Sequence, residues 1–267
     1  MQTPTDAASK PFTGKTAIVT GASKGIGRAI AQRLARDGAN VVITARDQTA
    51  LDSVVAEIRA TGGKAVALAL DLRQQEAPSM LVKFAVKGFG KLDVIVANAG
   101  ATKRGDFLEL TDEDWADGFA LKFFAHVRLI RTAWPHLKAS SGSVMNIGGV
   151  GGRTPGADFA IGGSVNAAMI TFTKALSEVG VRDGVQVNAI NPGLIRTDRL
   201  QKRLEEIMKQ QGVDLAGAES TIISAGRTTR IGEPEDIAAL VAFVAGPEGR
   251  LLQGSIIDMD AGATKTV

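Results

Sequence analysis

The sequence predicts an α/β fold in which one parallel sheet is covered by helices on both faces, giving three layers. Short runs rich in β-branched residues, such as residues 16–20 (TAIVT) and 40–44 (NVVIT), alternate along the chain with longer stretches of helical period. Parallel strands need a long crossover connection, usually a helix, so this alternation is typical of repeated βαβ units. The strand segments are almost continuously apolar, which indicates a doubly wound sheet buried on both sides.

The expected elements follow in order. The seven predicted strands are residues 16–20, 40–44, 64–70, 92–97, 142–147, 185–190 and 254–260. The six predicted helices are residues 25–37, 48–60, 76–88, 112–137, 158–181 and 234–245. Glu235 and Asp236 support the start of the last helix, because acidic side chains interact favourably with a helix N-terminus.

Residues 194–230 interrupt this alternation with a charged, helix-like piece and a polar stretch. Long excursions of this kind are usually lids or binding loops, so we expect a substrate loop or lid here. A chain of 267 residues with 45% hydrophobic content can bury one large core. We therefore expect residues 13–267 to form a single domain, preceded by a disordered polar tail over residues 1–12.

Composition excludes several classes of function. The chain has no cysteine and two histidines, so disulfides, thiolate metal sites and a cysteine nucleophile are excluded and no credible zinc site remains. The net charge of +3 is spread over interspersed charges, which argues against nucleic acid as a partner. No apolar run reaches the length of a membrane span, and the first residues do not resemble a targeting peptide. We expect a cytoplasmic protein that acts on a small molecule.

A glycine-rich turn follows the first predicted strand. Residues 20–27 read TGASKGIG and lead into an amphipathic helix. Glycines at such a junction permit a tight turn and let backbone amides at the helix N-terminus approach a pyrophosphate. The residues expected to bind a dinucleotide here are Gly21, Ser23, Lys24, Gly25, Ile26 and Gly27. Taken alone, the motif also allows a purely structural turn that needs glycine for positive φ.

The GxxxGxG spacing and several segments at predicted strand ends resemble the short-chain dehydrogenase/reductase (SDR) superfamily over nearly the whole chain. Those segments are Asp71-Leu72, Asn98-Ala99-Gly100 and Pro192-Gly193, the last followed by Ile195 and Thr197. The resemblance implies a Rossmann fold in which Asp71 flanks the adenine of a dinucleotide. It also implies that the Asn-Ala-Gly segment lies along the cofactor, and that the Pro-Gly segment with its Thr holds the nicotinamide end.

The end of the second predicted strand distinguishes between the two nicotinamide cofactors. A carboxylate there normally binds the ribose 2′-hydroxyl of NAD, whereas a 2′-phosphate requires cations. The acid is missing here, because Ala45 stands at its position and Arg46 follows. With Lys24 in the glycine turn, two cations are expected to converge on the phosphate. We predict NADP(H) over NAD(H). The alternative is that both cations are solvated and Asp47 contacts the ribose.

The catalytic residues that the resemblance implies are absent. In the superfamily a Tyr protonates the substrate oxygen and a Lys four residues later lowers its pKa, while a Ser and an Asn complete the set. The corresponding positions here are Gly162, Asn166, Gly149 and Lys122. A shifted alignment does not restore the phenol, because the chain contains no tyrosine. The two glycines are expected to leave side-chain volume free beside the nicotinamide.

Lys122 and Asn166 resemble an exchange of the family's Asn and Lys. Our hypothesis is that Lys122 points toward the substrate, polarises it and is held partly by Asn166. A positioned general acid contributes about 10² to 10⁴ in rate, whereas holding the reactants together contributes about 7–11 kcal/mol, so turnover remains possible without the phenol. The alternative is that Lys122 extends into solvent from a disused site. His126, one helical turn later, is expected to lie in the core or an interface.

Three functions stay open at this point. The first is an SDR-like NADP(H)-dependent oxidoreductase acting on a carbonyl or alcohol through a non-standard active site. The second is a non-catalytic NADP(H)-binding subunit or sensor that partners an active relative in a mixed oligomer. The third is a lyase or hydrolase, for which no nucleophile can be named. The resemblance also implies a homodimer or homotetramer paired through the helices at residues 112–137 and 158–181.

Overall fold

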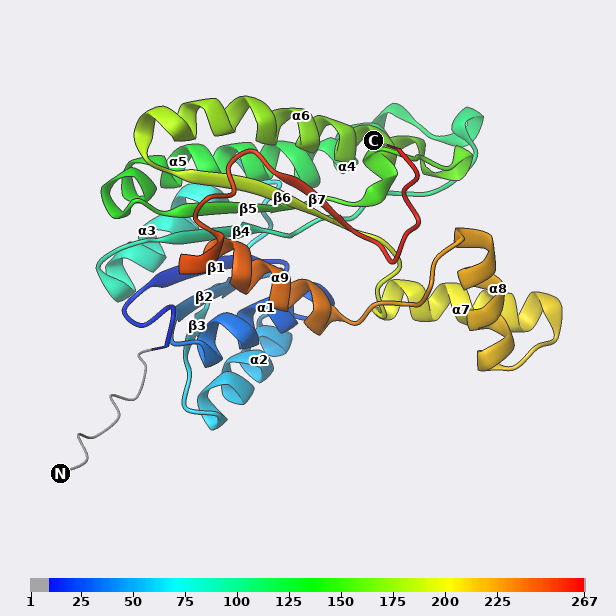
Figure 1. Cartoon of the computed structure of the whole chain (residues 1–267), viewed down its shortest axis with the longest axis horizontal. Coiled ribbons are helices and arrows are strands. Elements are labelled where there is room, and N and C mark those ends of the chain that lie inside the picture. Colours follow the sequence, from blue (N-terminus) through cyan, green and yellow to red (C-terminus); the bar gives the residue numbers. More distant parts are fainter. Residues whose placement is uncertain (1–9, 267) are drawn as a thin grey trace.

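The computed structural model describes residues 10–266 and confirms the predicted fold class (Figure 1). Within this range seven strands form one sheet in the order β3-β2-β1-β4-β5-β6-β7, with every neighbouring pair parallel. The strands are β1 (Thr16–Thr20), β2 (Asn40–Thr44), β3 (Lys64–Ala67), β4 (Val94–Ala97), β5 (Ser143–Ile147), β6 (Gln186–Pro192) and β7 (Ile256–Met259). The strand order reverses between β1 and β4, and ligands of such sheets bind beyond the carboxyl ends of the strands at this point.

Helices cover both faces of the sheet (Figure 1). One face carries α1 (Gly25–Arg36), α2 (Gln48–Ala60) and α9 (Pro234–Ala245), and the other carries α3 (Ala77–Phe89), α4 (Asp112–Phe119), α5 (Ala125–Ser140) and α6 (Ala160–Asp183). Successive strand side chains point to opposite faces. Val19 therefore packs in the apolar cluster that includes α1 and α9, whereas its neighbour Ile18 packs in the cluster that includes α3 and α5.

The expected long helix over residues 112–137 is interrupted in its middle. Between α4 and α5 the chain forms a π-helical turn, η2 (Ala120–Phe124), with Lys122 at its centre. A π turn inserts an additional residue into a helix and is frequent at functional sites. The local pattern of apolar residues does not reveal it, because the helical period resumes on either side.

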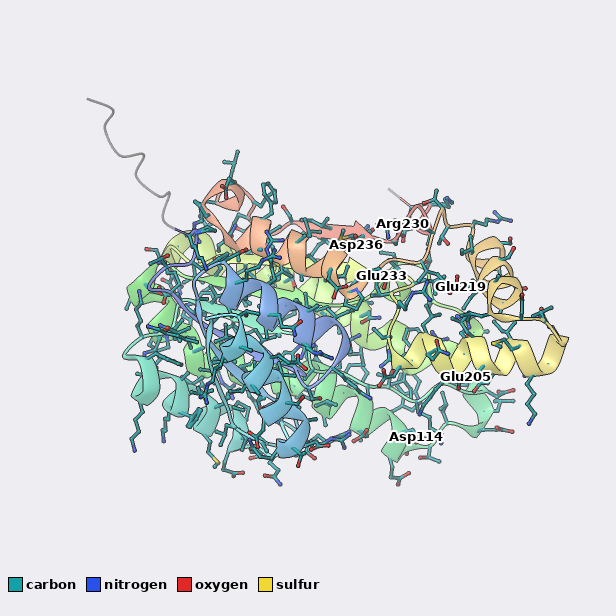
Figure 2. All side chains as sticks on the ribbon, turned by 90° about the horizontal axis from the view of Figure 1, so that it is seen from below. Asp114, Glu205, Glu219, Arg230, Glu233 and Asp236 are labelled. Atoms are coloured by element: carbon teal, nitrogen blue, oxygen red, sulfur yellow. The ribbon has the colours of Figure 1, made fainter. Side chains whose placement is uncertain are left out.

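Residues 194–230 contain a pair of helices, α7 (Asp198–Gln211) and α8 (Leu215–Gly226), where a loop or lid was expected. They project beyond the carboxyl ends of the strands (Figure 1) and enclose a small apolar cluster that includes Leu204 and Ile222. Arg196 links them to the body of the protein, because its guanidinium contacts Glu219 at 2.6 Å and Glu233 at 2.9 Å. Both carboxylates lie along this junction in Figure 2. A lid function stays a prediction.

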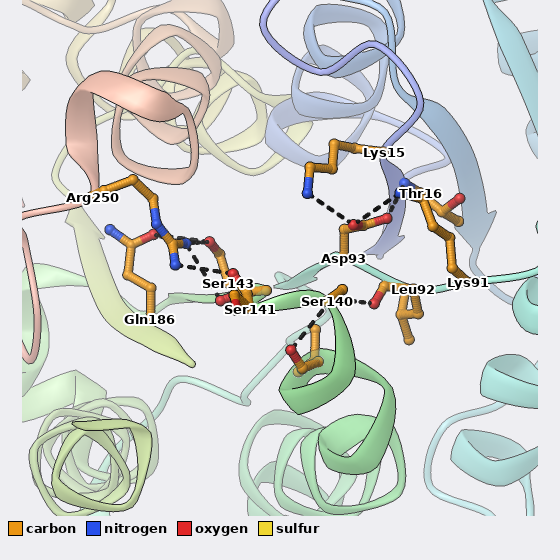
Figure 3. Close-up of polar contacts among 12 residues, drawn as sticks. Lys15, Thr16, Lys91, Leu92, Asp93, Ser140, Ser141, Ser143, Gln186 and Arg250 are labelled. Carbon is orange, nitrogen blue, oxygen red and sulfur yellow. Dashed lines mark hydrogen bonds and ion pairs between the residues drawn. The ribbon is translucent and has the colours of Figure 1, made fainter. Parts of the chain in front are cut away.

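The amino ends of the strands carry a separate polar network (Figure 3). The carboxylate of Asp93, which is 1% exposed, accepts a hydrogen bond from the backbone N–H of Thr16 at 2.8 Å and pairs with Lys15 at 3.1 Å. Nearby, Arg250 donates to the hydroxyl of Ser143 at 2.9 Å. These contacts lie at the amino ends of the strands, whereas ligands of such sheets bind at the carboxyl ends. We therefore assign the network a structural role.

Residues 1–9 of the expected polar tail lie outside the described residues. Phe12, which was placed in that tail, is 2% exposed, and its backbone N–H donates to the carbonyl of Asp37 at 3.0 Å. The packed part of the chain therefore begins earlier than the predicted boundary at residue 13, because this aromatic side chain is buried. Among the helices within residues 10–266, none combines the length and apolar character needed to cross a bilayer.

Candidate active site

The glycine turn after β1 has the conformation that its sequence predicts. Gly21 and Gly25 adopt positive φ angles of 65° and 55°. Gly27 is required for a different reason: a Cβ at this position would lie 2.3 Å from the carbonyl oxygen of Gly21 and 2.6 Å from Nδ2 of Asn98. The three glycines therefore seat the start of α1 against the ends of β1 and β4. Ser23 and Ile26 are partly buried within the same turn.

We expect Gly27→Ala to lower the free energy of unfolding by about 1–3 kcal/mol, because overpacking here meets backbone atoms that cannot move away cheaply. NADPH binding should be lost with it, since the turn must open to admit the methyl group. Thermal unfolding and a fluorescence titration with NADPH measure both effects. Gly88→Ala in α3 is the matched control: apart from its own helix backbone and chain neighbours, nothing lies within 4 Å of its Cβ position, so it should retain stability and binding. Equal behaviour of the two variants would contradict this account.

The amino end of α1 is open to a ligand. No side chain caps this helix at Lys24, whereas α2 is capped by Asp47, whose carboxylate accepts from the N–H of Ala50 at 3.1 Å. Uncapped amides at a helix N-terminus form a site for phosphate. Asn98 supports the turn by donating from Nδ2 to the carbonyl of Thr20 at 2.8 Å. The residues present therefore fit the pyrophosphate of a dinucleotide.

Of the two cations expected to converge at the end of β2, one is paired with a carboxylate in this structure. The ammonium of Lys24 pairs with Asp198 at 2.6 Å, at the start of α7, because the helix pair folds back against the glycine turn. Arg46 is exposed beside the end of β2. The alternative reading is also weakened, since one carboxylate oxygen of Asp47 already caps α2. An interaction of Arg46 with a 2′-phosphate stays a prediction.

The two expected binding residues after β3, Asp71 and Leu72, differ in how their side chains are placed. Asp71 accepts a hydrogen bond from the backbone N–H of Arg73 at 3.0 Å, while the side chain of Leu72 is 3% exposed and packs in the core. Leu72 can therefore offer a cofactor only its backbone. The remaining expected binding residues lie at the ends of two other strands: Ala99 and Gly100 follow β4, and Pro192, Gly193, Ile195 and Thr197 lie at or after the end of β6.

The chain after β6 passes close to the glycine turn. Gly193 is held tightly, because a Cβ there would lie 2.7 Å from Cα of Asp260. Ile195 is 8% exposed, and Thr197 leads into α7. A Cβ on Gly25 would lie 3.2 Å from Cγ2 of Thr197, so the segment from Pro192 onward borders the predicted cofactor cleft.

Lys122 points toward the carboxyl end of β5. Its carbon chain packs on Gly100, where a Cβ would lie 2.9 Å from Cδ of the lysine, and its ammonium donates to the carbonyl of Gly148 at 3.2 Å. Burial lowers the pKa of Lys122 to about 8, and the positive charge of Arg199 acts in the same direction. The alternative in which Lys122 extends into solvent is wrong. The lysine lies beside the position that the resemblance assigns to the family's Ser.

Asn166 does not hold Lys122, contrary to the hypothesis. Its side chain is 1% exposed and lies against Gly149, where a Cβ would be 2.9 Å from Nδ2. Within residues 10–266 its Oδ1 has no hydrogen-bond partner. The support that Asn166 was expected to give comes instead from the carbonyl of Gly148, because the π turn directs the lysine toward the strand end.

The volume expected to be free above Gly162 is filled by Phe159. A Cβ on Gly162 would lie 2.1 Å from Cε2 of this ring, and one on Gly151 would lie 2.8 Å from Cε1. The guanidinium of Arg104 covers the ring at 4.0 Å from its centre. Sequence reasoning missed Phe159. The available signal was its position three residues before Gly162, a spacing that brings side chains together at a helix start.

His126 is a core residue, as expected. It is 0% exposed and its Nε2 lies 2.8 Å from the carbonyl oxygen of Ala99. Burial lowers the pKa of His126 to about 4, so the ring is neutral near neutral pH and donates from Nε2. It therefore positions the backbone that follows β4. Across residues 10–266, no cluster of three His, Asp or Glu side chains has the geometry to hold a metal ion.

The sheet order, the uncapped helix after a glycine turn and the segments at the strand ends define a dinucleotide-binding α/β protein. A family model described as short chain dehydrogenase matches residues 15–207. An uncharacterized oxidoreductase of Mycobacterium tuberculosis (strain CDC 1551 / Oshkosh) is 36% identical over 252 residues, covering 94% of this chain and 92% of that protein. The NADPH-dependent reductase BacG of Bacillus subtilis (strain 168) is 33% identical over 256 residues, covering 95% and 99%.

Among solved structures, L-sorbose reductase from Gluconobacter frateurii in complex with NADPH and L-sorbose superimposes with a TM-score of 0.92 at 30% identity, covering 97% of this chain and 100% of that one. The chain belongs to the short-chain dehydrogenase family and is an NAD(P)-dependent oxidoreductase by this membership. The chain contains no tyrosine.

Proposed function

We propose that this protein is an NADP(H)-dependent reductase of a carbonyl substrate, working through a non-standard active site in which Lys122 replaces the family's Tyr as proton donor. The observation that carries the proposal is the placement of Lys122: its side chain packs on Gly100 and its ammonium donates to the carbonyl of Gly148 at the end of β5. Burial there lowers the pKa of Lys122 to about 8. Enzymes tune a lysine toward neutral pH for acid–base work, because a group titrating near the working pH both holds and releases its proton. Similarity to NADPH-dependent reductases supports the cofactor.

The chain's own groups would act as follows. Reduced nicotinamide, when bound, supplies the hydride that reaches the carbonyl carbon. Lys122 directs its ammonium, from Nζ, at the carbonyl oxygen, stabilises the negative charge that develops there and delivers a proton to it. Its amine then takes a proton from solvent. The carbonyl of Gly148 and the packing on Gly100 orient the lysine for this task. For oxidation of an alcohol the same groups act in reverse.

We further propose a preference for NADP(H) that depends on Arg46. Arg46→Ala should weaken NADPH binding by at least about tenfold, the effect of losing one charge-assisted hydrogen bond, and should leave NADH binding unchanged. Lys24→Ala is the matched control, because its ammonium is already paired with Asp198 and its loss should cost less. Fluorescence titrations with both dinucleotides give the result. Equal affinities of the native protein for NADPH and NADH, unaltered by Arg46→Ala, would remove the preference.

The reductase function is tested by incubating the protein with NADPH and a panel of ketones, aldehydes and acyl compounds while following NADPH absorbance. Oxidation of NADPH that depends on a carbonyl compound supports it. Tight NADPH binding without oxidation across the panel would favour the second candidate.

That second candidate is a non-catalytic NADP(H)-binding subunit or sensor, alone or in a mixed oligomer with an active relative. One observation favours it: Phe159 and Asn166 occupy the space above Gly162 and Gly149 that the family uses for chemistry. It predicts that replacing Lys122 changes neither cofactor binding nor any activity of such a relative. We also propose a homodimer or homotetramer paired through α5 and α6. The chain would form a single domain that includes Phe12, with α7 and α8 as its lid.

A further inference from the structure

Three cationic side chains from separate parts of the chain gather at the outer side of the candidate active site. Lys122 comes from η2, Arg199 from the first turn of α7, and Arg104 from the segment between β4 and α4. Lys122 packs on Gly100, and a guanidinium nitrogen of Arg199 lies 3.5 Å from the carbonyl oxygen of the same glycine. Arg104 reaches the site over the ring of Phe159.

These like charges repel one another. The positive charge of Arg199 contributes, after burial, to the lowered pKa of Lys122. The charge of Arg104 in turn disfavours the charged form of Arg199. In the part of the chain that the structure describes, Lys122 and Arg199 donate to backbone carbonyls rather than to carboxylates. Arg104 alone has an acidic partner, Asp158 at 2.8 Å. The three cations therefore share a single carboxylate, that of Asp158. The positive charge that is left can be neutralised by an anionic ligand.

We propose that Arg199, assisted by Arg104, binds an anionic group of the substrate and so presents the neighbouring carbonyl to Lys122. This inference rests on the proposed function and names its substrate class, a carbonyl compound carrying a carboxylate or a phosphate close to the carbonyl. Arginine suits this role because its planar fork matches the oxygens of either group. Arg199 is exposed and accessible to a ligand, whereas Lys122 lies deeper, at the strand ends.

Gly100 lies next to both cationic side chains of the proposed substrate site. Both Lys122 and Arg199 contact Gly100, one through its carbon chain and the other through the guanidinium. We therefore expect a ligand that contacts both side chains to carry its anionic group close to its carbonyl, as in 2-oxo and 3-oxo acids or a phosphorylated hydroxyketone. The helix pair that carries Arg199 is joined to the glycine turn through Lys24 and Asp198, so α7 brings the arginine beside the cofactor cleft.

The test uses charged and neutral probes of matched shape. Calorimetric titrations of the protein saturated with NADP⁺ compare pyruvate with methyl pyruvate, acetoacetate with methyl acetoacetate, and dihydroxyacetone phosphate with dihydroxyacetone. At least one anionic probe should bind about tenfold or more tightly than its neutral partner, as expected for a charge-assisted hydrogen bond. The carboxylate and phosphate pairs distinguish the two sources of the anion.

Two variants make the result specific. Arg199→Gln should abolish the difference between charged and neutral probes while leaving NADPH affinity intact. Arg203→Gln is the matched control, because Arg203 is exposed one helical turn along the same helix. The inference is overturned if charged and neutral probes bind alike, if both variants weaken anion binding equally, or if Arg199→Gln weakens NADPH itself.

Activity separates this inference from the proposed function. If an anionic probe binds through Arg199 but NADPH is not oxidised, the anion site is supported and the reductase function is contradicted for that class of compound. If neutral ketones are reduced at the same rate as their anionic partners, the reductase function is supported and the anion site is contradicted.

Discussion

Lys122→Met should lower kcat for carbonyl reduction by about 10² to 10⁴, the usual contribution of a positioned general acid. NADPH affinity should be unchanged, because the glycine turn, the start of α1 and Arg46 do not contact this side chain. Methionine keeps much of the lysine's apolar volume against Gly100, so the variant should also fold normally. Single-turnover rates with bound NADPH separate the chemical step from binding.

The pH dependence identifies the lysine more directly. A proton donor acts below its pKa, so reduction by the native enzyme should be constant below pH 8 and should fall about tenfold per pH unit above it, the behaviour of one essential acid. His126 faces Lys122 on the same helical segment, but with a pKa of about 4 it stays neutral throughout this range. Arg199 faces Lys122 from α7, and Arg199→Gln should move the fall to higher pH because a repelling charge is removed.

A matched control is Lys83→Met, on the exposed side of α3. It should leave both the rate and the pH profile as they are in the native protein. The mechanism is wrong if Lys122→Met retains the native rate. It is equally wrong if the descending limb above pH 8 persists in that variant, because another group would then be the acid.

The sequence predicts the fold well because its signals are local. A β-branched run, a glycine turn and a helix start lie within a few residues of each other, and each βαβ unit repeats this arrangement. Gly27 illustrates the limit of such reasoning. Its place in the motif predicts close packing. The atoms that it packs against are the carbonyl of Gly21, after β1, and the amide of Asn98, after β4. The second of these is far away in the sequence, so the motif alone does not predict it.

The candidate site is less accessible to sequence reasoning, because it depends on side chains brought together by tertiary structure. The pairing of Lys24 with Asp198 joins residues 174 positions apart, which composition does not indicate. Phe159 fills the space above Gly162 only because the short turn before α6 directs its ring inward. The π turn at Lys122 likewise redirects a lysine whose identity was apparent but whose orientation was not.

Gly162→Tyr is expected to lower the free energy of unfolding by about 1–3 kcal/mol, because a side chain at this position meets the ring of Phe159 and overpacks the site. Phe159→Ala alone should also destabilise the protein, since it removes a ring packed between Gly151 and Gly162. In the double variant the new ring has room to enter. The two changes should therefore be less costly together than their sum, by a coupling energy of about 0.5–3 kcal/mol.

Urea unfolding of the native protein, both single variants and the double variant measures this coupling. Gly162→Tyr combined with Phe243→Ala serves as the control pair, because Phe243 is half exposed on α9, across the sheet, and its effect should simply add. Additive behaviour of Gly162→Tyr with Phe159→Ala would show that the aromatic ring does not occupy the position of the family's phenol. Positive coupling together with retained NADPH binding would show that Phe159, rather than loss of the cofactor cleft, is what excludes a phenol from this site.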